Sequence, residues 1–223
     1  MLYIVGTPIG NLKDITFRAL ETLKQVDTII VESYHDSSKL LRHFEIEQKK
    51  IIKYNDRNKN RSIPGIIELL KTSDAAFITS AGMPSISDPG TDLVATCIAE
   101  NITVVPIPGV SAVSTLISVS PFSIKRHIFI GFMPRTVSKI KKLVHSYLEQ
   151  DSLLVFFESP FRLVKTLTLL ADEYPHCSII VGKEMTKKFE TFMHGDIQTV
   201  LAKIKENAKL QKGEFTIGIT ITS

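Results

Sequence analysis

Short apolar runs alternate with segments of helical periodicity along the first half of the chain. Five apolar, β-branched runs are typical of buried strands: residues 2–5, 28–31, 50–53, 75–79 and 103–106. Apolar residues recur at helical spacing in five further segments: residues 14–23, 37–44, 63–70, 91–100 and 111–118. Asp14 is expected to cap the first helix, and Pro64 to lie in the first turn of the third. This alternation predicts a parallel sheet with helices on both faces.

A Ser- and Pro-containing stretch at residues 118–123 interrupts the pattern and is the best linker candidate. We therefore expect an N-terminal α/β domain over 1–117, a linker over 118–126 and a C-terminal domain over 127–223. The second half has strand-like runs at 127–131, 153–157, 178–181, 189–193 and 215–222, and helical segments at 138–149, 161–171 and 197–205. Strands joined by only a few residues cannot form a parallel crossover, so a mixed sheet is expected in this domain.

Composition and charge narrow the class of protein. The 223 residues are enough for two domains, and 43% apolar with 22% charged residues excludes intrinsic disorder. Cys97 and Cys177 lie in apolar runs, as expected for buried thiols of a cytosolic protein. Because the first residues are strand-like and no apolar run approaches 18 residues, we expect neither a leader nor a membrane span.

The net charge of +4 is unevenly distributed. Residues 1–123 hold 12 basic and 13 acidic side chains, whereas residues 124–223 hold 15 and 10. A polyanion is therefore expected to contact mainly the second half, although lysines on a solvated surface explain the same excess.

Three loops follow strands of the predicted parallel sheet, at the edge where such sheets bind ligands: residues 6–11, 80–90 and 107–112. The 80–90 loop contains two prolines and two glycines, so it is stiff and exposes amides that suit a small ligand with amino and carboxylate ends. Two of the loops also have a purely structural explanation: residues 6–11 can form a tight turn, and Ser111 in the third loop can be an ordinary helix N-cap. The fingerprint G-x-G-x-x-G is absent, which disfavours a nicotinamide-dependent oxidoreductase, although Glu32 mimics the ribose-binding acid of that class.

Several motifs, taken in order, carry a family resemblance. In the first half they are GTPIGNL (6–12) with DIT (14–16), SISDPG (85–90) and PIPGVSA (106–112); in the second half they are FIGFMPR (129–135), FFESPFRL (156–163), KEMTK (183–187) and GEF (213–215). This series closely resembles the tetrapyrrole-methylase superfamily and, within it, the ribosomal small subunit methyltransferase I branch. The resemblance extends from residue 2 to the last strand.

The resemblance implies S-adenosylmethionine-dependent methylation of a cytidine ribose 2′-hydroxyl in 16S ribosomal RNA, with the RNA or the small ribosomal subunit as partner in the cytoplasm. It also implies two α/β domains with the cofactor in the cleft between them, and a homodimer, for which the apolar helix 111–118 offers an interface. The cofactor-binding residues it implies are Pro8, Ser80, Ala81, Gly82, Met83, Pro84, Ile86, Ser87, Val110, Ser111, Ala112, Phe157, Glu158, Phe215 and Thr216.

The chain departs from the branch in three places. Glu-Asp-Thr-Arg is replaced by Glu32-Ser33-Tyr34, Asp-Ala-Gly-Thr-Pro by residues 80–84 (SAGMP), and His-Glu-His-Asn by residues 53–56 (KYND). The chain also ends soon after the last strand, without the extra C-terminal region of longer relatives. These differences affect the expected RNA substrate more than the expected cofactor-binding loops. They leave open a small-molecule methylase on the same scaffold, and a non-catalytic RNA- or partner-binding protein.

Methyl transfer requires the acceptor oxygen in line with the methyl–sulfur bond and, in many cases, a group that removes a proton. It needs no metal, and the sequence has no H-x-x-x-H or C-x-x-C ligand spacing. Lys183, Glu184 and Lys187, together with Glu190, are the candidate catalytic group after strand 178–181. A lysine acts as a base only if its pKa is lowered, and an ion-paired edge is the alternative interpretation. Glu158 is a second acid/base candidate.

Arg135 and Arg162 lie beside loops at strand ends, where a guanidinium can bind a phosphate through two hydrogen bonds. Lys142 follows Arg135 at a spacing that puts both on one helix face. These three residues are the expected RNA-binding side chains.

Overall fold

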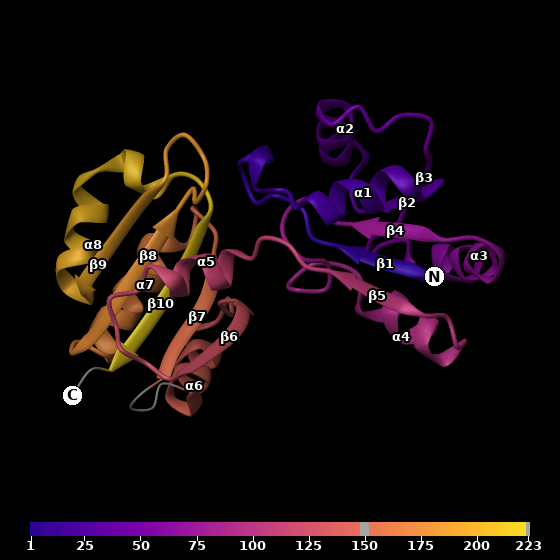
Figure 1. Cartoon of the computed structure of the whole chain (residues 1–223). Coiled ribbons are helices and arrows are strands. Elements are labelled where there is room, and N and C mark those ends of the chain that lie inside the picture. Colours follow the sequence, from indigo (N-terminus) through magenta and orange to yellow (C-terminus); the bar gives the residue numbers. More distant parts are fainter. Residues whose placement is uncertain (148–151, 222–223) are drawn as a thin grey trace. The chain divides into compact units, whose positions relative to one another are not determined.

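The computed structural model describes residues 1–147 and 152–221, which form two compact units, Met1–Ser111 and Ala112–Ser223 (Figure 1). The boundary falls earlier than the expected linker at 118–126. The reason is that helix α5 (Ala112–Ser118) packs against strands β8 and β10 of the second unit, with Leu116 fully buried. Residues 112–117 therefore belong to the second unit, not to the N-terminal domain expected over 1–117.

The first unit contains a five-stranded parallel sheet in the order β3-β2-β4-β1-β5, as the alternating pattern predicted. Its strands are β1 (Leu2–Val5), β2 (Thr28–Val31), β3 (Lys50–Lys53), β4 (Ala75–Ile78) and β5 (Val104–Ile107). Every residue of β2 and β4 is buried, which is typical of a parallel sheet covered on both faces.

Alternating side chains of the strands form two separate cores, one on each face of this sheet. Ile29 and Val31 pack with helices α1 (Phe17–Gln25) and α2 (Tyr34–His43). Ile30 and Phe77 pack on the other face with helices α3 (Lys59–Thr72) and α4 (Thr91–Ala99). The prediction of helices on both faces is thus confirmed.

Two local predictions in this unit are wrong. Asp14 lies in the short 3-10 helix η1 (Leu12–Asp14), and the cap of α1 is Thr16, whose hydroxyl accepts a hydrogen bond of 3.1 Å from the Ala19 amide. Helix α3 begins at Lys59, so Pro64 lies in its interior and not in its first turn. The earlier start follows from a turn at Asn58 that orders the residues before the expected helix.

The second unit contains a mixed sheet in the order β6-β7-β10-β8-β9, which confirms the second topological prediction. Only β6 and β7 are parallel, and the other three pairings are antiparallel. The strands are β6 (Arg126–Phe132), β7 (Ser152–Glu158), β8 (Cys177–Lys183), β9 (Thr191–Asp196) and β10 (Phe215–Ile221), and the helices after α5 are α6 (Val137–Tyr147), α7 (Leu163–Glu173) and α8 (Ile197–Glu206). A second 3-10 helix, η2 (Ala208–Gln211), precedes β10. The expected ends at 149 and 222 lie outside the described residues.

Helices α6, α7 and α8 contribute to one apolar core with this sheet, around Phe156, Ile179 and Ile217. Cys97 and Cys177 are both buried free thiols, as expected. Among the described residues no helix is long and apolar enough to cross a membrane.

Candidate functional site

The three loops singled out in the sequence meet at the carboxyl ends of β4, β1 and β5, which are neighbours in the first sheet. Thr7 and Gly82 exchange two backbone hydrogen bonds of 2.9 and 3.0 Å. A Cβ on Gly6 would lie 2.7 Å from Gly109 Cα, and a Cβ on Gly109 would lie 2.9 Å from Gly6 Cα. The close approach therefore requires glycine at both positions. We call residues 6–9, 80–90 and 109–110 the loop cradle.

The 80–90 loop of the cradle is held in an unusual backbone conformation. Ser85 and Ser87 have φ of 69° and 62°, in the left-handed region that is unfavourable for residues with a side chain. The loop is closed by hydrogen bonds from Ser85 N to Pro89 O (3.2 Å) and from Ile86 N to Met83 O (3.4 Å). The Ser85 hydroxyl is buried, and it has no hydrogen-bond partner among the residues that the structure describes. Strain and an unsatisfied buried hydroxyl together are typical of a ligand-binding loop.

Glu32 extends the cradle at the end of β2. Its Oε2 accepts hydrogen bonds from the Ser80 amide (3.2 Å) and from the Ser80 hydroxyl (2.9 Å). Ser80 replaces the Asp that is usual in the branch, and an Asp carboxylate could not donate to Glu32 in this way. The predicted ligand residue Ser80 therefore directs its side chain to Glu32.

A pocket of about 440 Å³ lies beside this contact, in the first unit. It is lined by Glu32, Ser33, Lys53, Asn55, Asp56, Arg57, Ser87, Asp88 and Pro89. Burial of the Asp88 carboxyl, with the negative charge of Glu32 nearby, raises the pKa of Asp88 to about 6. Asp88 is the only acid in the 80–90 loop, and sequence reasoning assigned no role to it.

The predicted cofactor residues Phe157, Glu158, Phe215 and Thr216, and the predicted catalytic residue Lys183, lie where β7 and β8 end beside the start of β10. Phe215 pairs with Glu158 on one side and with Lys183 on the other, and Thr216 pairs with Phe157. The structure thus gathers these five residues, which come from three different strands, at one edge of the second sheet.

Internal contacts occupy the Glu158 carboxylate, which is fully buried. It accepts hydrogen bonds from Thr166 Oγ1 (2.6 Å) and from the Ser159 amide (2.7 Å), and it lies 3.1 Å from Arg162 Nη2. This network joins the end of β7 to helix α7 and makes Glu158 a structural anion.

Arg162 is also engaged within the unit. Its Nη2 donates to the carbonyl oxygens of Met133 (2.7 Å) and Pro134 (2.6 Å), so it connects the start of α7 to the loop after β6. These contacts account for Arg162 without a phosphate. Arg135 and Lys142 are exposed and form no ion pair among residues 1–147 and 152–221, so the phosphate-binding prediction now rests on these two residues. They do not share a helix face as expected, because α6 begins at Val137, after Arg135.

Glu184 and Lys187 form an ion-paired loop edge, the alternative interpretation of their sequence. Lys187 Nζ lies 3.3 Å from Glu184 Oε1 and 3.0 Å from Glu214 Oε2, and the Glu214 amide donates to Glu184 Oε1 at 2.8 Å. Burial disfavours both ions, but these contacts outweigh it, so the pKa of Glu184 is lowered and the pKa of Lys187 is raised. Lys187 therefore does not meet the condition for a general base.

Lys183 differs from Lys187 in its surroundings. It is 6% exposed, and its Nζ donates a long hydrogen bond of 3.5 Å to the Phe189 carbonyl. The sequence could not separate the two lysines, because the partner that engages Lys187, Glu214, comes from a distant part of the chain. Within the described residues no group of three or more metal-ligating side chains is found.

Comparison with known proteins places this geometry in a family. The family model "Tetrapyrrole (Corrin/Porphyrin) Methylases" matches residues 1–201. A Borrelia garinii protein named ribosomal RNA small subunit methyltransferase I is 40% identical over an alignment 225 residues long, which covers 100% of this chain and 100% of the relative. Proteins of the same name from Thermotoga maritima (39% identical, 97% of this chain and 96% of the relative) and Streptococcus pyogenes (41%, 96% and 74%) are also similar.

Solved structures share the fold at much lower sequence identity. The methyltransferase CobJ superposes with a TM-score of 0.73 at 12% identity, covering 99% of this chain and 94% of that chain. Diphthine synthase superposes with a TM-score of 0.72 at 14% identity, covering 98% and 89%. The chain belongs to the tetrapyrrole methylase family and, within it, to the group of ribosomal RNA small subunit methyltransferase I proteins.

Proposed function

We propose that this protein transfers a methyl group from S-adenosylmethionine to the ribose 2′-hydroxyl of a cytidine in 16S ribosomal RNA. The observation that carries the proposal is the 40% identity, over the full length of both chains, to a relative named ribosomal RNA small subunit methyltransferase I. The relatives' names support an RNA substrate, and the 2′-hydroxyl and the cytidine rest on the resemblance alone.

The loop cradle fits the cofactor. A molecule with amino, carboxylate and adenosine groups needs closely approachable amides and hydroxyls, and the cradle offers glycine-lined backbone and the buried Ser85 hydroxyl. Pro8, residues 80–87 and residues 110–112 would hold it, with Phe157, Phe215 and Thr216 as the proposed contacts from the second unit. When bound, the cofactor supplies a methyl group already activated by its sulfonium.

Lys183 is the proposed proton acceptor for the ribose hydroxyl. Its side chain is 6% exposed and lies at the end of β8, which pairs with Phe215, and a lysine Nζ that carries no proton has a lone pair that can accept the hydroxyl proton as the oxygen attacks. Glu184 and Lys187, paired with each other, are positioning residues that hold the loop beside it. We expect Lys183→Met to lower kcat by about 10²- to 10⁴-fold while leaving the Kd for the cofactor within twofold.

Lys183→Arg is the matched variant, because it keeps the positive charge but cannot act as a base at neutral pH. Both variants should lose activity if Lys183 accepts the proton. If Lys183→Arg methylates RNA at the wild-type rate, the lysine serves only as a cation and the assignment of the base is wrong.

The decisive experiment uses small ribosomal subunits from a strain that lacks the native enzyme. Purified protein and tritium-labelled S-adenosylmethionine should label 16S ribosomal RNA, and mapping of ribose methylation should show one modified cytidine. Label in a tetrapyrrole precursor but not in RNA would make the protein a small-molecule methylase. A melting temperature that does not change with millimolar cofactor would make it a non-catalytic binding protein.

The remaining parts of the proposal concern assembly and RNA contact. We propose that Arg135 and Lys142 bind phosphates, that the protein acts as a homodimer, and that it acts in the cytoplasm, where ribosomal subunits are its substrate. Light scattering on purified protein tests the dimer, and the salt dependence of RNA binding by Arg135→Gln tests the phosphate contact.

A further inference from the structure

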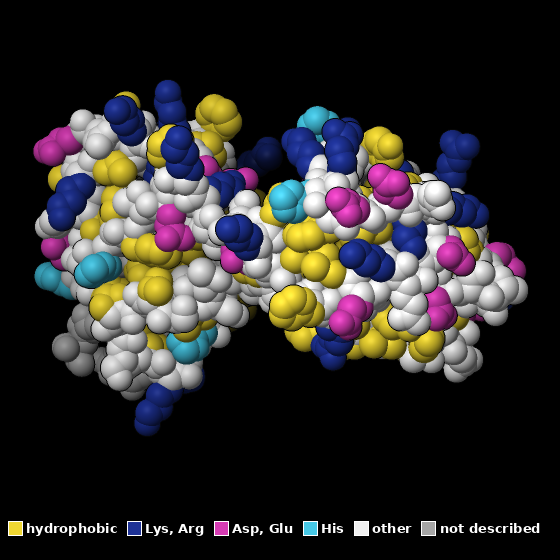
Figure 2. All heavy atoms as spheres, turned by 45° about the horizontal axis from the view of Figure 1, so that its top comes forward, with side chains coloured by type: hydrophobic (Ala, Val, Ile, Leu, Met, Phe, Trp, Pro, Cys, Tyr) yellow, Lys and Arg dark blue, Asp and Glu magenta, His cyan; other side chains and the backbone are white. Residues whose placement is uncertain are grey.

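One short segment of the first unit is strongly basic although the unit as a whole is not. Residues 49–61 contain six basic side chains and one acidic one, so the rest of residues 1–123 contains six basic and twelve acidic side chains. On the face of the first unit that Figure 2 shows, basic and acidic side chains are interspersed. The expectation that a polyanion contacts mainly the second half rested on the net charge of residues 1–123, in which the acidic side chains elsewhere outweigh this basic segment.

The basic segment forms the edge of the first sheet. It comprises β3, which is the last strand in the order β3-β2-β4-β1-β5, the following turn and the start of α3. Lys50, Lys53, Arg57 and Arg61 are exposed and form no ion pair within the part of the chain that the structure describes. In contrast, Lys59 pairs with Asp92. Four cations are therefore available for a partner along this edge.

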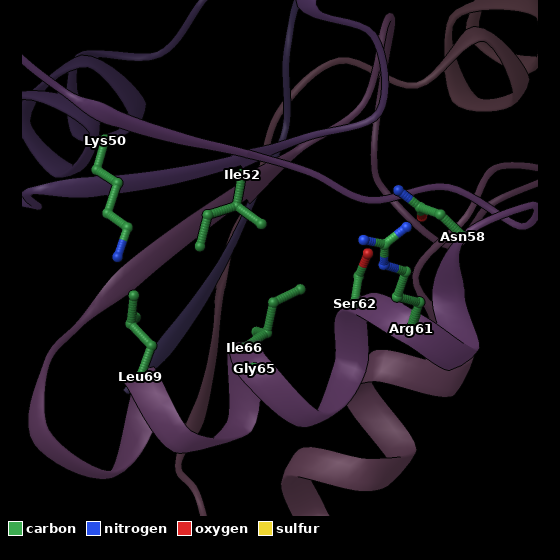
Figure 3. A pocket seen from close by; sticks show the side chains of 8 residues that line it. All are labelled: Lys50, Ile52, Asn58, Arg61, Ser62, Gly65, Ile66 and Leu69. Carbon is green, nitrogen blue, oxygen red and sulfur yellow. The ribbon is translucent and has the colours of Figure 1, made fainter.

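A pocket of about 460 Å³ lies between β3 and α3 (Figure 3). Ile52 and Leu69, which are partly exposed, give it an apolar surface, and Ile66, which is 1% exposed, belongs to the core against which they pack. Figure 3 shows Lys50 and Leu69 at one end of the pocket and Arg61 at the other, with Ile52 and Ile66 between them. Asn58 and Ser62 add polar groups beside Arg61.

The polar end of the pocket is rigid. Asn58 Oδ1 accepts a hydrogen bond from the Asn55 amide (2.8 Å), and Asn58 Nδ2 donates to the Lys53 carbonyl (3.0 Å). These bonds fix the turn between β3 and α3 and hence the start of the helix that carries Arg61. A site ordered before binding loses less entropy when the ligand arrives.

Gly65 keeps the pocket open. A Cβ at this position would have no protein atom within 4 Å, so packing does not demand a glycine there. Glycine inside a helix is destabilising relative to alanine, and here it follows Pro64 in the interior of α3. The missing side chain leaves room above the apolar surface.

The cations continue from this pocket toward the loop cradle. Lys53 and Arg57 line the other pocket, which is bordered by Ser87 and Asp88 of the 80–90 loop. Lysine on an edge strand also discourages pairing with other chains, which accounts for Lys50 and Lys53 but not for the two arginines or for the open pocket. The carboxylates of Glu32, Asp56 and Asp88 also line that second pocket, so the surface that suits phosphates is the one around the pocket between β3 and α3.

We propose that the pocket between β3 and α3 binds one nucleoside of the RNA substrate, next to the segment that enters the cradle; this inference rests on the proposed function. The base and ribose lie on Ile52 and Leu69, and the flanking phosphates contact Lys50 and Arg61. Unstacked bases of single-stranded RNA bind apolar surfaces in this way, with cations following the backbone.

The test fills the pocket in one variant and removes its charge in another. Gly65→Leu places a side chain in the open space, and Gly65→Ala is its control. Lys50→Gln combined with Arg61→Gln removes two cations, and Lys203→Gln combined with Lys205→Gln removes two exposed cations from α8 as the charge-matched control. Circular dichroism checks that each variant folds. If Gly65→Leu does not fold, the variant with Lys50→Gln and Arg61→Gln still tests the pocket, because both side chains are exposed.

Binding of single-stranded 16S fragments is measured by filter retention at several salt concentrations. We expect Gly65→Leu and the pocket charge variant to weaken RNA binding about tenfold and to raise the KM for RNA, with the cofactor Kd and kcat unchanged. Loss of two phosphate contacts lowers the slope of log K against log salt by about 1.4. The two controls should change the RNA Kd by less than about twofold.

The outcomes separate this site from the proposed function. If wild-type protein methylates RNA and both pocket variants bind it normally, the site is wrong and the function stands. If wild-type protein binds RNA through the pocket but methylates none, the function is wrong and the site stands. If millimolar inorganic phosphate raises the melting temperature as much as a ribodinucleotide does, the pocket binds only an anion and the nucleoside proposal fails.

Discussion

Replacement of Asp88 by asparagine should stabilise the protein, and by an amount that depends on pH. Burial, together with the charge of Glu32, raises the pKa of Asp88 from 3.8 to about 6. A raised carboxyl pKa means that the folded state resists ionisation, so the native carboxylate is destabilising at neutral pH. The asparagine side chain has nearly the same shape and no charge to desolvate.

The magnitude follows from the size of the shift. A change of about two pKa units corresponds to about 3 kcal/mol when both states are ionised. Asp88 is only partly buried, so screening by solvent reduces the figure, and we expect about 1–2 kcal/mol above pH 7. Below about pH 3 the carboxyl is protonated in both states and the advantage of asparagine disappears. The gain therefore develops between about pH 3 and pH 7 and is constant above that range.

Urea unfolding of the full chain, followed by far-ultraviolet circular dichroism at pH 4.5, 6 and 7.5, measures this dependence. Asp56→Asn is the matched control, because Asp56 is an exposed acid that lines the same pocket. We expect it to change the free energy of unfolding by less than about 0.5 kcal/mol at every pH. A gain for Asp88→Asn that is zero, or equal at all three pH values, would falsify the electrostatic explanation.

Three further substitutions or treatments test other parts of the structure. Gly109→Ala brings a Cβ within 2.9 Å of the Gly6 backbone, so it should lower stability by about 2 kcal/mol in a urea titration and weaken cofactor binding in calorimetry. Arg162→Met leaves the buried Glu158 carboxylate without its cation and should destabilise the protein by about 3 kcal/mol; a loss of less than about 1 kcal/mol would show that the network contributes little. Burial raises the pKa of Cys177 to about 12, so this thiol should not react with Ellman's reagent at pH 8 until urea unfolds the protein.

The strands and both sheet types could be predicted because they depend on local apolar periodicity. The runs at 28–31 and 50–53 coincide with β2 and β3, and short connections alone required the second sheet to be mixed. The first residue of a helix is harder to predict from the sequence. Asp14 and Thr16, for example, are both good capping residues and lie two positions apart. The hydroxyl of Thr16 reaches the Ala19 amide, and only the three-dimensional course of the chain decides between the two.

The roles of charged residues could not be predicted from residue type. Arg162 was expected to bind a phosphate, but its partners are the carbonyls of Met133 and Pro134, which β6 and β7 bring within reach. Lys187 is a candidate base from the sequence, but in the structure its Nζ lies 3.0 Å from Oε2 of Glu214, which directly precedes β10. Each residue also has a partner nearby in the sequence, Glu158 for Arg162 and Glu184 for Lys187, but the sequence contains no local signal for the distant partners.

The 80–90 loop gives a physical reason for ligand binding that does not depend on the family. It combines positive φ at Ser85 and Ser87, the unsatisfied Ser85 hydroxyl and the raised pKa of Asp88. Each of these features destabilises the folded chain, the backbone strain by about 1–3 kcal/mol for each residue. No stability requirement explains why they occur together in one loop, whereas a ligand that bonds to the Ser85 hydroxyl and the loop amides would offset part of them. Such a ligand must stabilise the first unit most, so its binding should slow amide exchange in β4 and α4, on either side of the loop, more than in β8 and β10.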